Sequence, residues 1–329
     1  MPNASNDSVA TVAPSKRVLV VLYSQTGQLT RIANTIVKPL SHEPAITVHV
    51  EVLQPVRRHP FPWPLLTFLD AFPESAHLTG EPLEPLSKDS AGEFDLVILC
   101  YQVWFLAPSL PVTAFLKGDA ARRLLSGKPI VTVIACRNMW MMAHRHMQRL
   151  LADVGARHLD NVVLTDKAGT LTTLLTTPLW LLTGRKHPIA GLPPAGVAED
   201  DIARSRRFGK ALRDGLLSNR ERADAPMLSG LAAVEANPRL LVSERAGTRS
   251  FQLWGRLIRL AGGPGTAARK PLLVLYAFFL LALIVTVVPV SLAIQALLRP
   301  MMGKWLTAQK LAFEAPSGSG TDRLALYDE

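Results

Sequence analysis

The sequence predicts an α/β fold, a doubly wound five-stranded parallel sheet of order 2-1-3-4-5 with hydrophobic insertions and a C-terminal membrane helix. Five short runs rich in apolar and β-branched residues alternate with helical patterns. Two of these runs are continuously apolar, as strands buried on both faces are. The first run passes through a polar turn directly into a helix. The predicted strands are residues 18–22, 46–53, 95–101, 129–135 and 159–165.

Composition limits the compartment and the partners. The 329 residues suffice for one large or two ordinary domains, and the net charge of +10 suits an anionic partner such as a membrane surface or a phosphorylated cofactor. The two cysteines, Cys100 and Cys136, cannot form a disulfide framework, and buried inert thiols are the favoured interpretation over a redox pair. Residues 1–16 are polar, lack a signal-peptide core and are predicted to be disordered.

The turn after the first strand has the chemistry of a phosphate site. Hydroxyl side chains flank an amide, Gly27 allows close backbone approach, and a helix N-terminus follows. No lysine follows the glycine, and neither the Walker pattern nor G-x-G-x-x-G is present. An ordinary strand-turn-helix without a ligand is the alternative. The candidate phosphate-binding residues are Ser24, Gln25, Thr26, Gly27, Gln28 and Leu29.

Two further strand ends carry groups suited to a ring-shaped ligand. In a doubly wound sheet the ligand lies outside the carboxyl ends of the strands at the switch point, so the segments after residues 101 and 135 should meet there. The alternatives are core aromatics for the first segment and a surface arginine bonded to a helix end for the second. The candidate ring-binding residues are Gln102, Val103, Trp104 and Phe105, then Arg137, Asn138 and Trp140.

These motifs resemble those of known flavin-binding proteins. The turn Y-S-Q-T-G-Q-L resembles the flavodoxin phosphate loop, which holds the 5′-phosphate of FMN, and the Trp104-Phe105 segment is similar to the flavin-contacting loop of flavodoxin-like quinone reductases, with Gln102 where a proline would stand. Together with A-C-R-N-M-W and a hydrophobic C-terminal extension, they resemble, over nearly the whole chain, the bacterial dialkylresorcinol condensing enzyme group. The resemblance implies a flavodoxin-like fold, FMN as cofactor and a role in dialkylresorcinol biosynthesis. Arg137 would stabilise negative charge on the reduced flavin.

The domain boundaries follow from composition. A helix over 199–217 closes a flavodoxin-like domain of residues 17–217, which contains insertions at 54–93 and 166–197. The apolar stretch 61–69 is expected to pack over a pocket or to dip toward lipid, the alternative being a loop with its own small core. The apolar stretch 170–182 is expected to be a buried helix or a lid with a lipid-like lining. Residues 218–270 are interpreted as a linker that ends in an interfacial helix over 251–260, although Leu231, Val234, Leu240 and Leu241 could still dock on the domain.

The C-terminal part predicts a membrane segment. Residues 272–298 contain no charged side chain and are long enough to cross a bilayer, so residues 271–299 are assigned to the membrane and 300–329 to a tail. Flanking Lys and Arg are too evenly divided to fix the orientation. Loading of FMN in the cytosol would place the catalytic domain on the cytoplasmic face of the membrane. Whether the segment spans the bilayer or is monotopic stays open.

The function expected from these observations is FMN-dependent oxidation of a lipophilic ring, from a dialkylcyclohexanedione to a dialkylresorcinol. The ring would give hydride to the flavin while His144, His146 or Tyr101 removes the adjacent proton. The two histidines point to different helix faces, so no metal site is expected. The alternatives are an NAD(P)H:quinone-type reductase, and a non-catalytic electron carrier or membrane scaffold for a ketosynthase and an acyl carrier protein. Nucleic acid is not an expected partner, since aromatic interleaving is missing; a homodimer is left open.

Overall fold

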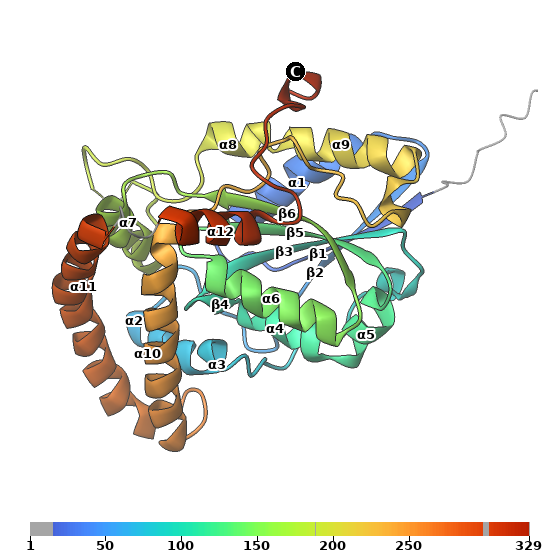
Figure 1. Cartoon of the computed structure of the whole chain (residues 1–329). Coiled ribbons are helices and arrows are strands. Elements are labelled where there is room, and N and C mark those ends of the chain that lie inside the picture. Colours follow the sequence, from blue (N-terminus) through green and yellow to red (C-terminus); the bar gives the residue numbers. More distant parts are fainter. Residues whose placement is uncertain (1–15, 188, 299–302, 329) are drawn as a thin grey trace, which may run out of the picture.

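A computed structural model describes residues 16–187, 189–298 and 303–328 (Figure 1). All but the last residue of the N-terminal segment predicted to be disordered lies outside the described residues.

The sheet confirms the predicted fold class. Its order is β2-β1-β3-β5-β6 with every one of these pairs parallel, which is the 2-1-3-4-5 order of a flavodoxin-like sheet once the short β4 is set aside. The two-residue β4 (Ala107–Pro108) pairs antiparallel with β3, so the segment expected to be a loop after residue 101 is a tight hairpin. The long strands are β1 (Lys16–Leu22), β2 (Ile46–Val52), β3 (Leu96–Trp104), β5 (Pro129–Cys136) and β6 (Arg157–Thr165).

Helices cover both faces of the sheet (Figure 1). One face carries α1, α8 and α9, and the other carries α4, α5 and α6. Helix α1 buries Ile32, Ile36 and Leu40, whose spacing makes one apolar face. The predicted closing helix over 199–217 is two helices that meet at Ser205. The bounds are α1 (Gln28–Ser41), α4 (Leu110–Lys117), α5 (Asp119–Leu125), α6 (Met141–Asp153), α8 (Glu199–Arg204) and α9 (Arg206–Leu217).

The contact between α1 and α9 depends on Gly209. A Cβ at this position would lie 1.9 Å from the Ile36 carbonyl oxygen, which is backbone and cannot turn away. We therefore expect Gly209→Ala to lower the free energy of unfolding by about 3 kcal/mol, although the same change in an exposed helix is stabilising. Gly263→Ala is the matched control, because a Cβ there meets open space. Urea unfolding of both variants tests this; equal stability would contradict the close approach.

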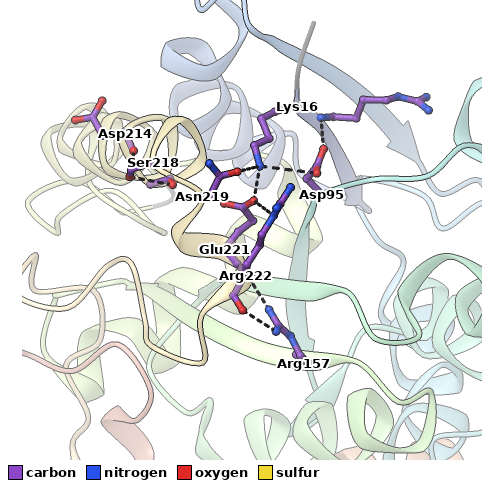
Figure 2. Close-up of polar contacts among 10 residues, drawn as sticks. Lys16, Asp95, Arg157, Asp214, Ser218, Asn219, Glu221 and Arg222 are labelled. Carbon is purple, nitrogen blue, oxygen red and sulfur yellow. Dashed lines mark hydrogen bonds and ion pairs between the residues drawn. The ribbon is translucent and has the colours of Figure 1, made fainter.

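Residues 218–240 are not a linker. Met227, Leu228 and Leu231 are fully buried in the main core. At the start of this segment Lys16 donates from Nζ to Asn219 Oδ1 at 2.7 Å and pairs with the buried Glu221 (Figure 2). The prediction of a linker from composition was wrong. The segment lacks long apolar runs, but single apolar residues and a buried ion pair fix it to the sheet.

The two apolar insertions lie together at the carboxyl ends of the strands. The first contains α2 (Leu65–Asp70) and α3 (Phe72–Ala76), and the second is α7 (Thr170–Thr183). The Trp63 N–H donates to the Leu181 carbonyl at 2.8 Å, and the ring of Phe61 lies 6.2 Å from that of Trp180, edge to face. Helix α7 and the first insertion therefore form one layer.

The C-terminal part forms a helical hairpin and then returns to the domain. The hairpin, which we call the α10–α11 hairpin, consists of α10 (Leu241–Leu260) and α11 (Lys270–Leu298), so the interfacial helix is longer than predicted. Among the described residues, one helix is long and apolar enough to cross a membrane, with a candidate span over Ala267–Thr286. Short 3-10 helices are Lys88–Ala91, Arg220–Arg222, Pro238–Leu240, Ala267–Arg269 and Leu324–Leu326.

The predicted C-terminal tail is a packed part of the domain. Helix α12 (Gly303–Glu314) buries Phe313 in the main core, where its ring meets Trp140. Beyond it, Ser317 donates to the buried Asp160 at 2.7 Å, and the Ala232 N–H donates to the Gly320 carbonyl at 2.7 Å. The sequence beyond the apolar helix is rich in Gly and Ser, and its bonds to residues far away in the chain could not be read from it.

The turn between α10 and α11 is fixed by a buried ion cluster. Arg269, 1% exposed, donates to Asp70 Oδ1 at 3.2 Å and to both carboxylate oxygens of Glu74 at 3.0 and 2.6 Å. Asp70 also accepts from the Gly265 N–H at 2.6 Å. Removing one partner from such a cluster leaves an uncompensated buried charge, so the cluster locks the start of α11 to α2 and α3.

Candidate functional site

The first strand end presents an uncapped helix N-terminus. Gly27 precedes α1 in the left-handed region at φ 77°, with open space where a Cβ would be, and no side chain caps the helix. The hydroxyl oxygen of Ser24 is buried beside it and has no hydrogen-bond partner. Backbone N–H groups at a helix N-terminus, together with the helix dipole and an unpaired hydroxyl, can bind a phosphate. The predicted phosphate turn therefore has the geometry for an anion.

Not every residue of that turn is free for a ligand. Thr26 Oγ1 accepts weakly from the Gln28 N–H at 3.4 Å. The Gln28 amide exchanges two hydrogen bonds of 3.0 Å with the backbone of Val197, and the Leu29 side chain is fully buried in the core. Gln28 and Leu29 therefore position the helix, and their side chains point away from the turn's open side.

The second strand end lies against the first. Gln102 accepts from the Gln25 N–H through Oε1 at 3.2 Å, so the ends of β1 and β3 are bonded together. Trp104, 8% exposed, places its ring 5.8 Å from Tyr23. Val103 is half-buried and pairs with Pro108 in the hairpin. The structure thus brings Gln25, Gln102 and Trp104 to one edge of the sheet.

Phe105 does not lie beside Gln25, Gln102 and Trp104. Phe105 and Leu106 form the hairpin turn with φ of 48° and 62°, a conformation that costs non-glycine residues of order 1–3 kcal/mol each. The turn directs the Phe105 ring onto Phe68, Phe72 and Phe251, in a second apolar cluster between α2, α3 and α10. Phe105 therefore anchors the α10–α11 hairpin to β3.

The third strand end carries a half-buried guanidinium. Arg137 donates to Thr173 Oγ1 at 3.4 Å and contacts Met139 Sδ at 3.3 Å, and no carboxylate lies within ion-pair distance of it in the described chain. Burial lowers the pKa of Arg137, while the more distant Cys136, Asp166 and Glu244 oppose that shift. Since Ala135 is paired with Gln102, Arg137 lies next to the Gln102–Trp104 strand end. An anion would complete its surroundings.

Helix α7 crosses these strand ends, and we call it the roof helix. Thr173 near its start accepts from Arg137, while Trp180 near its end packs against Phe61. A Cβ on Gly196 would meet both Gln28 and Trp180, so the roof helix also reaches the start of α1. The roof helix therefore covers the region between Arg137 and the phosphate turn.

Unpaired polar atoms occur on three segments near this end of the sheet. Within the described chain, Ser24 Oγ, Asn138 Oδ1 and Thr177 Oγ1 are buried without a hydrogen-bond partner. They come from the turn after β1, the turn after β5 and the roof helix itself. Because buried polar groups are nearly always paired in folded proteins, each of these three atoms is a candidate contact for a polar ligand.

The three candidate bases lie in the interior. Tyr101 and His144 are fully buried, and His146 is 7% exposed on the same helix as His144. Burial lowers the pKa of His144 to about 3, with His158 adding to the shift, and it raises the pKa of Tyr101 well above its usual value. His144 and His146 lie on α6, and Tyr101 lies on β3 three residues before Trp104.

His59 is a candidate base that sequence reasoning missed. Its Nε2 lies 2.9 Å from Glu81 Oε1, and its ring packs 4.9 Å from Trp104 and 5.4 Å from Trp63. A carboxylate that holds one nitrogen of an imidazole orients the ring. The partners are 22 residues apart in a proline-rich insertion, so no local pattern signals the pair.

Asn138 and Trp140 line a groove at the ends of β5 and β6. The groove has a volume of about 720 Å³ and includes Asp166, Arg239 and Lys310 in its wall. Trp140 is nearly fully buried, and its ring meets His144 and Phe313. Of the residues predicted at the third strand end, Arg137 thus faces the roof helix, Asn138 lines the groove, and Trp140 joins α6 to α12.

A buried carboxyl from α10 binds the start of α6. Glu244 is fully buried, its Oε2 accepts from the Met142 N–H at 2.7 Å, and its Oε1 has no partner. Burial raises the pKa of Glu244 to about 7, against the opposing effects of the α6 N–H groups and Arg137. The carboxyl connects the α10–α11 hairpin to the turn that carries Arg137.

Glu244 predicts a pH dependence of stability. Between its usual pKa of 4.5 and about 7 the folded chain keeps the proton that the unfolded chain loses, so the stability contributed by this group falls as pH rises through that window. Glu244→Gln should therefore gain stability relative to the parent protein, by on the order of 2–3 kcal/mol, between pH 4.5 and 8. Urea unfolding at several pH values measures this, and the exposed Glu235→Gln is the control. A difference that is constant with pH would contradict it.

The two cysteines are separate thiols. Cys100 is fully buried in β3 opposite Val133, and burial raises its pKa to about 12. Burial also raises the pKa of Cys136, with Glu244 adding to the effect. Both are therefore protonated and unreactive at neutral pH.

Comparison with known proteins finds similarity in solved structures alone. No family model and no curated protein matches the chain. A flavoprotein in complex with FMN from Lactobacillus acidophilus aligns with a TM-score of 0.37 at 14% identity, over 45% of this chain and 93% of its own. A flavodoxin from the domain Archaea gives 0.34 at 11% identity, over 61% and 99%. A Fusobacterium nucleatum flavodoxin bound to flavin mononucleotide gives 0.26 at 12% identity, over 47% and 73%.

Proposed function

We propose that this chain is a membrane-associated, FMN-dependent oxidoreductase that aromatises a dialkylcyclohexanedione to a dialkylresorcinol. The observation that supports it best is the set of groups that follow β1 and β5. The glycine that precedes α1 supplies no side-chain cap, the Ser24 hydroxyl is buried without a hydrogen-bond partner among the described residues, and Arg137 forms no ion pair within them. These groups suit the phosphate and the electron-rich ring of a reduced flavin. The flavoproteins among the similar structures are consistent with this cofactor.

The residues would have different roles in binding FMN, according to their positions. Ser24, Thr26 and the N–H groups around Gly27 would bind the phosphate, while Trp104 and Arg137 would border the ring. FMN, when bound, supplies a two-electron acceptor for the hydride that leaves the substrate ring. Asp166 accepts from the Gly196 N–H at 2.9 Å and so helps to hold the segment after the roof helix in place.

His59 is the base that we assign in place of His144, His146 and Tyr101. It lies against Trp104, and Glu81 would stabilise the imidazolium that forms when it takes the ring proton. Tyr23, whose pKa is raised by burial and then by Glu81, stays protonated beside it and can donate to a substrate carbonyl. The exposed apolar side chains of Leu65 and Leu175 on the covering elements suit a substrate with alkyl chains.

The test is a single anaerobic turnover. Protein loaded with FMN is mixed with a dialkylcyclohexanedione, and we expect the yellow colour to bleach while a product two hydrogens lighter appears by mass spectrometry. His59→Gln should slow bleaching by roughly 100-fold or more while FMN stays bound. Bleaching by NAD(P)H alone, with reoxidation by a quinone, would instead support the quinone-type reductase. A protein that does not bind FMN would support the scaffold for a ketosynthase and an acyl carrier protein.

A further inference from the structure

The α10–α11 hairpin carries an exposed apolar surface. On α11, four exposed apolar residues are separated by four, three and four positions, which places them on one face of the helix. On α10, three exposed leucines are separated by four and three positions. Their opposite faces are buried against α2 and α3, in the cluster around Phe72 and Tyr276. The surface is therefore one side of a packed layer. The exposed large apolar residues are Val274, Leu275, Phe278, Leu281 and Val285 on α11 and Val242, Leu253, Leu257 and Leu260 on α10.

The same layer is strongly basic. Residues 241–298 contain six Lys and Arg but a single acidic residue, Glu244, which is buried. Arg249 and Arg256 stand four residues before Leu253 and three residues after it, so they share its exposed face. Lys270 is exposed at the start of α11. Leucines flanked by arginines on one helix face are typical of a helix that lies in the headgroup region of an anionic bilayer.

Both ends of α11 are attached to the same domain. Its start is locked to α2 and α3 by Arg269 with Asp70 and Glu74. Four residues separate its end, Leu298, from the start of α12. Helix α12 buries Phe313 in the main core, and the chain beyond it forms the Ser317–Asp160 hydrogen bond. A helix of 29 residues is roughly 43 Å long, so a spanning orientation would put its ends on opposite sides of a hydrocarbon core of about 30 Å.

We infer that the α10–α11 hairpin binds the surface of an anionic bilayer without crossing it, and that residues 16–260 and 303–328 lie on the same side of the membrane. A spanning α11 would require either the Arg269 cluster or the packing of residues 303–328 to come apart. The inference rests on the membrane association in the proposed function and not on its chemistry. Figure 1 shows the roof helix and α2 at the same end of the sheet as α11, which would turn the candidate site toward the lipid.

Sidedness is tested by labelling the full chain in membranes. Asp224→Cys and Leu326→Cys place single reactive thiols on the domain and on the C-terminal segment, at side chains that are 90% and 73% exposed. A membrane-impermeant maleimide should label both variants in inverted vesicles and neither in intact spheroplasts. Unsubstituted protein gives the background from Cys100 and Cys136. Labelling of the two variants from opposite sides would overturn the inference, as would recovery of the chain as a soluble dimer.

The basic face is tested separately with vesicles. The triple variant Arg249→Glu, Arg256→Glu and Lys270→Glu should bind vesicles of phosphatidylcholine and phosphatidylglycerol at least tenfold more weakly than the parent protein. The matched control reverses Lys117, Arg122 and Arg123 to Glu, the same change of charge on exposed residues of α4 and α5. Equal binding by both triple variants would overturn the assignment of this face. Because FMN content is not part of either measurement, failure here is distinguishable from failure of the flavin proposal.

Discussion

Gly27→Asp is expected to weaken FMN binding by about 100-fold. The new carboxylate would stand at the N-terminus of α1, where the phosphate would lie, and two like charges about 4 Å apart repel by roughly 1–4 kcal/mol between water and a protein surface. The substitution also places a side chain on a residue with φ 77°. Titration of the FMN-free protein with FMN, followed by flavin absorbance and by calorimetry, measures the loss.

Gly127→Asp separates backbone strain from charge. Gly127 has φ 70° and open space at its Cβ position, as Gly27 has, but it lies in the turn before β5 at the opposite edge of the sheet. We expect the two variants to lose similar stability, while Gly127→Asp binds FMN normally. If both variants bind FMN as the parent protein does, the turn after β1 is not the phosphate site.

Arg137→Met is expected to lower the reduction potential of the bound flavin. A hydrogen bond to a charged group contributes about 1.5–3 kcal/mol, and about 30 mV corresponds to 1.4 kcal/mol for a two-electron couple, so the potential should fall by roughly 30–65 mV. The physical reason is that the hydrogen bonds of the Arg137 guanidinium within the described chain go to the neutral Thr173 and Met139, so it would bond to the charge that the flavin gains. Redox titration against a dye of known potential measures the shift.

Arg207→Met is the control for the loss of a buried cation. Arg207 is also half-buried, and its guanidinium donates to the Leu231 carbonyl at 2.9 Å, on the face of the sheet covered by α9. It should bind FMN at an unchanged potential. A potential that moves equally in both variants would show a general effect of net charge, and an unchanged potential in Arg137→Met would remove Arg137 from the ring site.

The sheet could be predicted because each strand is a short run with its own local pattern. The apolar run 18–22 and residues 96–101 are buried as the sequence indicated, and the order expected of a doubly wound sheet is the order observed. The neighbouring strand ends at Gln25 and Gln102 were predictable for the same reason. Local pattern also found the roof helix.

The errors concern residues whose surroundings come from distant parts of the chain. Phe105 was expected beside Trp104, but two successive residues with positive φ turn it toward α10. His59 is a candidate because Glu81 holds it, and residues 303–328 are ordered by bonds to Asp160 and to the backbone of residues 230–234. None of these contacts has a signature in the local sequence.

The return of the chain after α11 bears on how a water-soluble form could be produced. Cutting the chain at Gly263 would leave Asp70 and Glu74 without Arg269 and would strip the main core of Phe313. Such a fragment would expose apolar core surface and leave two buried carboxylates unpaired, and it should precipitate. Trimming the outward leucines of α10 and α11 to serine or glutamine, with both chain ends kept, is the better route to crystals.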